Sequence, residues 1–262
     1  MNEHRMRVAA GLALLALAVS GCGMRQAAER QETVNGLVAL YAELEFPEHF
    51  RQENPAKTGT EFDVQDYFTV LDHLSLEPGQ VLDYVYYFDE MGGEPILYVR
   101  PAEQPSYETY ADYVDAGGEP FGVGEWRYRY LDQIRVDGTE EGFFQFILLR
   151  VMGGQFYLYW HANYNDRMVV CTSGEMEDIL DSLSADDYFG IPITAEQAAA
   201  ARAIDLAPSV EMGAQSVTVR VVTFTKWGGF RRFSYVLQRS YPHTILDVTY
   251  QDLVSYDCGV AF

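Results

Sequence analysis

The sequence predicts an α+β protein built from largely antiparallel sheets with peripheral helices. Three observations support this class. Dense runs of Val, Leu, Tyr and Phe are separated by two-residue turn signals such as Asp137-Gly138 and Gly153-Gly154, and such short turns favour antiparallel hairpins over parallel crossovers. Helical patterns flank these runs instead of alternating with strands. Apolar residues make up 48% of the chain, too many for a disordered protein.

The N-terminal third predicts two helices and a hairpin. Apolar residues recur at helical spacing over 31–45, and a second helix is predicted over Val64–Leu74 with Asp63 as its N-cap. The apolar run Val81–Phe88 is predicted to turn at a glycine pair into a partner strand at Ile96–Val99. A short helix is expected from Ser106 to Val114.

The middle of the chain predicts four strands followed by two capped helices. The strands are expected at Trp126–Val136, Gly142–Met152, Gln155–His161 and Arg167–Cys171. Thr172 with Glu175, and Thr194 with Gln197, have the spacing of capping boxes. They predict helices to about Ser184 and over 195–203.

The C-terminal part is predicted to be β-rich, with strands at Ser216–Thr225, Phe230–Arg239 and Thr244–Tyr250 and a last segment to Phe262. We therefore divide the chain into a signal peptide (1–21), a tether with the N-terminal helix (22–58), an α+β domain (59–185) and a β-rich part (186–262). The last two parts either share one domain or form two.

The N-terminus has the pattern of a secretory signal. Arg5 and Arg7 precede an almost wholly apolar stretch from Val8 to Val19. That stretch is too short to cross a hydrocarbon core, which needs about 20 residues in a helix. A basic start, a short apolar core and small residues before a cleavage site together predict export.

The residues Val19-Ser20-Gly21-Cys22 resemble the lipobox of bacterial lipoproteins. The resemblance covers residues 1–22 only and implies cleavage before Cys22, with a diacylglycerol on its sulfur. It therefore implies a protein anchored by lipid to the extracytoplasmic face of a membrane, because two or more acyl chains hold a protein there stably. An ordinary secretory peptide with a chance cysteine is the alternative.

Charge and cysteine content restrict the possible partners. Cleavage would remove two arginines and one glutamate, which leaves 16 basic and 38 acidic side chains and a net charge of −22. Such a charge repels nucleic acid, so we expect no nucleic-acid partner. Cys171 and Cys258 remain after Cys22, either as one disulfide or as two thiols.

Signatures of catalysis and of cofactor binding are missing. The chain has no HExxH, GxSxG, SxxK or phosphate-loop motif, and its histidines after the signal, His49, His73, His161 and His243, are isolated. We predict no cofactor and no metal site, and we assign no catalytic residue. Carboxylates are abundant, so a hydrolase using two of them remains an alternative.

One basic stretch stands out in this acidic chain. No acidic residue occurs between Glu211 and Asp247, whereas five basic residues do. Its centre is predicted to be a hairpin tip carrying Lys226, Trp227, Arg231 and Arg232. Such a tip suits anionic headgroups, an anionic envelope polymer or an acidic protein. Alternatively, its cations pair with acidic residues of the same chain.

The leading hypothesis is a non-catalytic, membrane-anchored extracytoplasmic lipoprotein that binds a partner or an envelope component. The alternative is a hydrolase directed at the cell wall or at glycans. A substrate-binding lipoprotein of an importer fits less well, because such proteins usually have two α/β lobes and the hairpin pattern does not suit them.

Overall fold

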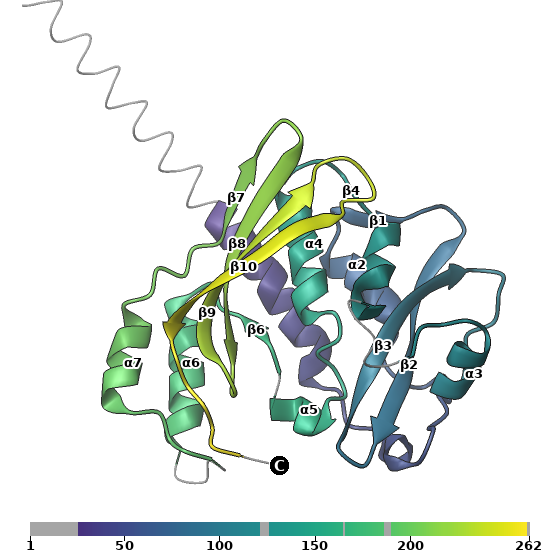
Figure 1. Cartoon of the computed structure of the whole chain (residues 1–262), viewed down its shortest axis with the longest axis horizontal. Helices are drawn as coiled ribbons and strands as arrows, with labels where there is room; N and C mark the ends of the chain where they lie inside the picture. The colour runs from purple at the N-terminus through teal and green to yellow at the C-terminus, as the bar shows by residue number, and fades with distance from the viewer. Residues whose placement is uncertain (1–25, 121–125, 165, 186–189, 261–262) are drawn as a thin grey trace, which may run out of the picture.

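The computed structural model describes residues 26–120, 126–164, 166–185 and 190–260 (Figure 1). It confirms the predicted α+β class with antiparallel sheets. The apolar stretch of the predicted signal and Cys22 lie outside the described residues. Within them, no helix combines the length and apolar character needed to span a bilayer.

The first half of the described chain is mixed. The N-terminal helix covers 26–42. After it come η1 (Glu48–Arg51), η2 (Val64–Asp66), α2 (Tyr67–Val70), β1 (Leu74–Leu76), β2 (Gln80–Asp89), β3 (Gly92–Pro101), α3 (Tyr110–Asp115), η3 (Trp126–Gln133), β4 (Ile134–Val136) and α4 (Glu140–Met152).

The second half supplies every strand of the largest sheet. Its elements are β5 (Tyr159–Trp160), α5 (His161–Tyr164), β6 (Met168–Val169), α6 (Ser173–Ser184), α7 (Ala195–Arg202), β7 (Ser209–Met212), β8 (Ser216–Thr225), β9 (Gly229–Gln238) and β10 (Ile245–Val254).

Within the described residues, these strands form three antiparallel sheets. The largest has the order β10-β9-β8-β6, and β7 pairs with the other half of the β8 edge. A second sheet has the order β2-β3-β5, and β1 pairs with β4 in a third. Both predicted hairpins are present, as β2–β3 and β8–β9. The first one turns at Glu90-Met91, and Gly92 and Gly93, where the turn was predicted, are the first residues of β3.

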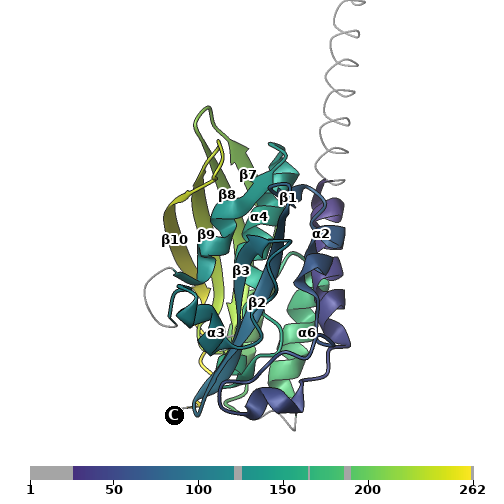
Figure 2. The same ribbon diagram turned by 90° about the vertical axis from the view of Figure 1, so that its right-hand side faces the viewer.

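Helix α4 forms the centre of the main core. In Figures 1 and 2 it lies between the large sheet and the N-terminal helix. Ten of its residues between Gly142 and Met152 are buried. Arg30 of the N-terminal helix joins it by ion pairs to Glu140 and Glu141. The inward face of β8 and β9, with Val219 and Tyr235, belongs to the same cluster.

The middle of the chain corrects the prediction. Gly142–Met152, expected as a strand, lies within helix α4, and most of Trp126–Val136 is a 3₁₀ helix followed by the short β4. A continuously apolar run has no period that separates a buried helix from a buried strand. The deciding signal was Thr139, whose side chain accepts the amide hydrogen of Gly142 and caps α4.

Smaller corrections concern the lengths of predicted elements. The helix predicted over Val64–Leu74 ends at Val70, and Leu74 begins β1 instead. Only Tyr159–Trp160 and Met168–Val169 of two further predicted strands are paired. Both capping boxes are confirmed and begin α6 and α7.

Candidate functional site

The predicted basic hairpin tip (226–232) packs against its own chain. Lys226 Nζ lies 3.7 Å from a carboxylate oxygen of Asp166 and 5.7 Å from the centre of the Tyr164 ring. Trp227 stacks on the same ring, at 5.6 Å between ring centres. Two of the four candidate binding residues therefore contact the segment around α5.

The other two candidates are also engaged. Arg231 pairs with Asp252 at 2.7 Å, and Arg232 donates to the main-chain carbonyl of Asp205 at 2.6 Å. Gly229 has a φ of +74°, and a Cβ there would lie 2.2 Å from the Val254 carbonyl oxygen. The tip is therefore a packed element whose cations contact oxygens of the same chain. This is the alternative stated in the sequence analysis, in which these cations pair within the chain.

The two remaining cysteines are free thiols. Cys258 is buried in the hydrophobic cluster that α6 and α7 form with the large sheet, and its amide donates to the Lys226 carbonyl at 3.0 Å. Cys171 packs on the edge of the main core, where burial raises the pKa of its thiol to about 12. The Cys171 thiol is therefore not an activated nucleophile, because such groups need a lowered pKa.

A pocket of about 440 Å³ lies where the β2–β3 hairpin, the end of α4 and the chain leading into β6 meet. Three arginines line it and define what we call the arginine pocket: Arg127 of η3, Arg150 of α4 and Arg167 ahead of β6. Its volume is in the range of small-molecule sites. Three guanidinium groups in one cavity are notable in a chain of net charge −21.

Aromatic rings hold two of these guanidinium groups. Arg150 lies 3.7 Å from the centre of the Tyr128 ring, and Arg167 lies 5.2 Å from the centre of the Phe233 ring. Both residues are half-buried. Among the described residues, Arg167 makes no ion pair. Arg167, which lies on a ring, can offer its planar donors to a bidentate contact with a carboxylate or phosphoryl group.

The carboxylates of the pocket are already engaged. Asp89 accepts the amide hydrogens of Met91 and Gly92 at 2.7 and 2.9 Å. Glu94 pairs with Arg127 at 2.9 Å. Burial raises the pKa of Glu94, and Arg127 partly offsets that effect. The pocket lining therefore has a cationic excess.

The rim of the pocket contains strained backbone. Trp160 has a φ of +50° and is 55% exposed. Its ring stacks on His161, which lines the pocket, at 5.7 Å. A bulky residue in the left-handed region costs about 1–2 kcal/mol, and such strain is concentrated at functional sites. An exposed indole at the rim also offers a spectroscopic signal for binding.

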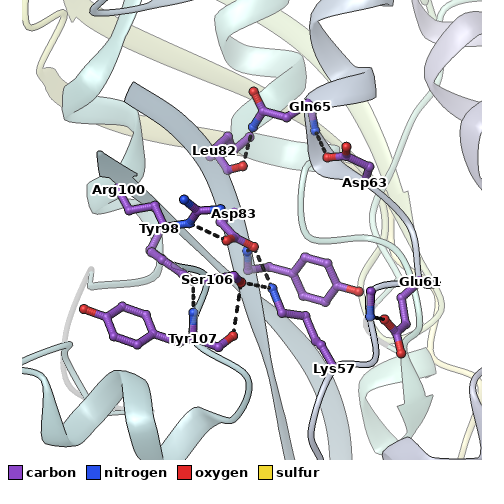
Figure 3. Close-up of polar contacts among 12 residues, drawn as sticks. Lys57, Glu61, Asp63, Gln65, Leu82, Asp83, Tyr98, Arg100, Ser106 and Tyr107 are labelled. Carbon is purple, nitrogen blue, oxygen red and sulfur yellow. Dashed lines mark hydrogen bonds and ion pairs between the residues drawn. The ribbon is translucent and has the colours of Figure 1, made fainter. Parts of the chain in front are cut away.

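A second pocket, of about 400 Å³, lies beside β2. Figure 3 shows Lys57 between Asp83 and Ser106, with Nζ 2.6 Å from the carboxylate and 2.9 Å from the hydroxyl. A Ser-Lys pair can act as nucleophile and base only when the lysine is neutral. Lys57 Nζ donates to both the Asp83 carboxylate and the Ser106 hydroxyl, so this pair is not arranged for the lysine to take a proton from the serine.

Sequence reasoning missed the arginine pocket. Arg127, Arg150 and Arg167 are far apart in the chain, and each occurs in a locally mixed segment. Two of their segments were expected to be strands that are in fact helical. Among the described residues, no group of three His, Cys, Asp or Glu side chains is arranged to hold a metal ion.

No protein family, curated protein or solved structure matches this chain.

Proposed function

We propose that this chain is a lipid-anchored, extracytoplasmic binding protein that holds a small anion, or the anionic end of an envelope component, in the arginine pocket. One observation supports this proposal. Arg127, Arg150 and Arg167 line one cavity, and both carboxylates of the cavity already accept hydrogen bonds from the same chain, Glu94 from Arg127 and Asp89 from the Met91 amide. The ligand group is a carboxylate or a phosphoryl group, since both match the planar guanidinium donors.

The proposed anchor is the lipid on Cys22, which follows from the resemblance of Val19–Cys22 to a lipobox. A soluble ligand and an envelope polymer are both reachable from that position. Mass spectrometry of the purified protein tests the anchor separately. An N-terminal Met1, or a Cys22 thiol without lipid, would exclude it.

Binding is tested with the processed chain in detergent, using sulfate as the simple anion and dextran sulfate as the polymeric one. Trp160 fluorescence is measured with Trp126 and Trp227 replaced by Phe, because the chain has three tryptophans. It reports binding because the Trp160 ring stacks on the pocket residue His161. Substituting Arg167→Gln removes a charge-assisted hydrogen bond, worth about 1.5–3 kcal/mol, so the sulfate affinity should fall at least tenfold.

Arg231→Gln is the matched control, because it removes an arginine from the hairpin tip, where Asp252 already pairs with it. It should leave sulfate affinity within twofold of the wild type. Equal losses in both variants would mean that the binding is diffuse and that the pocket is not the site.

A glycan-directed hydrolase is the second candidate, and one observation favours it. Glu94 and Asp89 line the same pocket, and burial raises the pKa of Glu94, as a general acid requires. Release of reducing ends from purified peptidoglycan, abolished by Glu94→Gln, would establish the hydrolase. Absence of release by the wild-type protein would reject it.

A further inference from the structure

Strand β10 is the outer strand of the large sheet. It pairs with β9 along one edge, and no described residue pairs with its other edge (Figures 1 and 2). Every residue from Leu246 to Asp252 is exposed. An edge strand presents a row of unpaired amide and carbonyl groups to which a second strand can bind. The free edge of β10 is therefore a pairing surface.

The central part of β10 carries none of the common protections of an edge strand. Natural edge strands are often blunted by lysine, by proline or by β-bulges. Residues 244–254 contain no Lys, Arg or Pro. The register with β9 is regular from Asp247 to Asp252, and its two shifts lie at the ends of that stretch. A second strand can therefore pair with a regular backbone over 247–252.

The apolar layer of the sheet continues onto β10 and is uncovered there. Val248 lies opposite Tyr235 of β9, and Tyr250 lies opposite Phe233, so each pair shares one face of the sheet. The two β9 residues belong to the main core and are 1% and 8% exposed. Val248 and Tyr250 are 38% and 57% exposed. The apolar face is thus covered over β9 and open over β10.

The charge of this sheet suits a second copy of the chain. Residues 216–254, which form β8, β9 and β10, carry five basic and two acidic side chains, a net charge of +3 in a chain of net charge −21. The rest of the chain therefore carries −24. Two such chains repel each other over their acidic parts. They repel each other least when they approach through this sheet, and β10 is its free edge.

We infer that β10 is a dimerisation strand, along which two copies of the chain pair antiparallel about a two-fold axis at Thr249. This axis places Val248 opposite Tyr250 of the second copy, twice by symmetry. A β-branched side chain opposite an aromatic ring is a favourable cross-strand pair. An axis at Tyr250 would instead place Val248 opposite the carboxylate of Asp252.

The pairing also avoids like charges on the outer face of the sheet. With the axis at Thr249, Asp247 lies opposite Gln251 of the second copy, and the two Thr249 side chains lie opposite each other. Asp252 already pairs with Arg231 of its own chain. The inference uses no residue that lines the arginine pocket and needs no lipid anchor, so it and the proposed function can fail separately.

Sedimentation equilibrium of the processed chain, in a detergent that matches the solvent density, measures the mass of the protein alone. We expect twice the mass of one chain. The association should tighten with added salt, because screening weakens the repulsion between two acidic chains. Val248→Lys should weaken it at least about tenfold, since each new ammonium would lose water against a tyrosine ring. A wild-type protein that stays monomeric at every concentration would overturn the inference.

Gln251→Lys is the matched control, because it places the same side chain on the same exposed strand. In the inferred register it lies opposite Asp247 of the second copy, so two pairs of opposite charge form by symmetry. Each such pair is favourable, and the association should tighten about twofold or more. Equal weakening by both lysine variants would contradict the register and with it the inference.

Cysteine substitution tests the axis directly. Opposite residues of antiparallel strands have Cα atoms about 4.5–5.5 Å apart, a separation that a disulfide can bridge. Oxidation by air and copper should therefore link two copies of Thr249→Cys. In Asp247→Cys the two thiols would be four residues apart along the strands, about 13 Å, and should not link.

The wild-type chain, whose Cys171 and Cys258 are free thiols, controls for links made by other cysteines. Equal linking in Thr249→Cys and Asp247→Cys would mean random collision and would refute the dimer. Absence of a link in Thr249→Cys, together with a monomeric mass, would leave the edge to a strand of another protein.

Discussion

The arginine pocket and the basic hairpin tip both concentrate cations in an acidic protein, but they use them differently. At the tip, Lys226 and Arg231 meet the carboxylates of Asp166 and Asp252. In the pocket, Arg150 and Arg167 lie on the rings of Tyr128 and Phe233. The tip is closed by its own partners, whereas in the pocket Arg167 lies on a ring beside a cavity and makes no ion pair with a described residue.

The difference shows that a run of cations in a sequence does not by itself mark a binding surface. The stretch between Glu211 and Asp247 is basic because the acidic partners of its cations lie elsewhere in the chain. Arg167, by contrast, lies in a segment that has no run of cations, and the fold places it in the wall of a cavity. Three-dimensional pairing decides which cations can bind a ligand.

The largest effect is expected from Gly229→Ala, which tests whether the hairpin tip is closed. Gly229 has a φ of +74°, and an added Cβ would lie 2.2 Å from the Val254 carbonyl oxygen. Left-handed strain and the displaced backbone together should lower the free energy of unfolding by about 3 kcal/mol, measured by urea denaturation.

Gly138→Ala is the control, because Gly138 has a similar φ of +86° and open space around it. It should cost about 1 kcal/mol from strain alone. Equal costs for the two variants would show that the tip is not packed against the segment after β10.

The next effect concerns binding. The double variant Arg150→Gln/Arg167→Gln should lower sulfate affinity about 100-fold, since two charge-assisted contacts of about 1.5 kcal/mol each are lost. The corresponding hairpin variant, Arg231→Gln/Arg232→Gln, should change it less than twofold. A titration followed by Trp160 fluorescence compares them, and the reverse ranking would return the hairpin tip to the role predicted from the sequence.

A smaller effect is expected from Lys226→Gln. Burial raises the pKa of Asp166, and Lys226 partly offsets that effect. The two side chains are 26% and 29% exposed, so solvent screening limits the loss of stability to about 1 kcal/mol. Urea denaturation at pH 7 measures this loss.

Adding Asp166→Asn to Lys226→Gln should restore most of the stability, because the uncompensated carboxylate is then gone. Arg202→Gln, which removes an exposed partner of Glu177, should give no measurable change. If the single Lys226 variant is as stable as the wild type, the tip lysine is not held by Asp166 and its ammonium remains available to a partner.

Local patterns predicted the fold where they were unambiguous. The alternation in β8 and β9 and the capping boxes at Thr172 and Thr194 identified their elements. Helix α4 was missed because its sequence is apolar on every side, so periodicity carried no information. The arginine pocket was missed for a different reason: Arg167 lines it only because the fold brings residues distant in the chain together.

The smallest effect expected is a pH dependence of anion binding. Burial raises the pKa of Glu94 above its ordinary value, and Arg127 pairs with the ionised form. As the pH falls through that raised pKa, Glu94 becomes neutral and releases the Arg127 donors. Sulfate keeps its charge over this range, so its affinity should rise, by about threefold if one weak contact is gained.

A second carboxylate, Asp89, and one histidine, His161, also line the pocket, and a proton gained by either one also favours an anion. Glu94→Gln separates their contribution from that of Glu94. This variant should bind sulfate more tightly than the wild type at pH 7 and show a flatter pH profile. A profile as steep as that of the wild type would assign the effect to His161 or Asp89. Arg127 would then stay paired with Glu94 at every pH, as Arg231 stays paired with Asp252 at the hairpin tip.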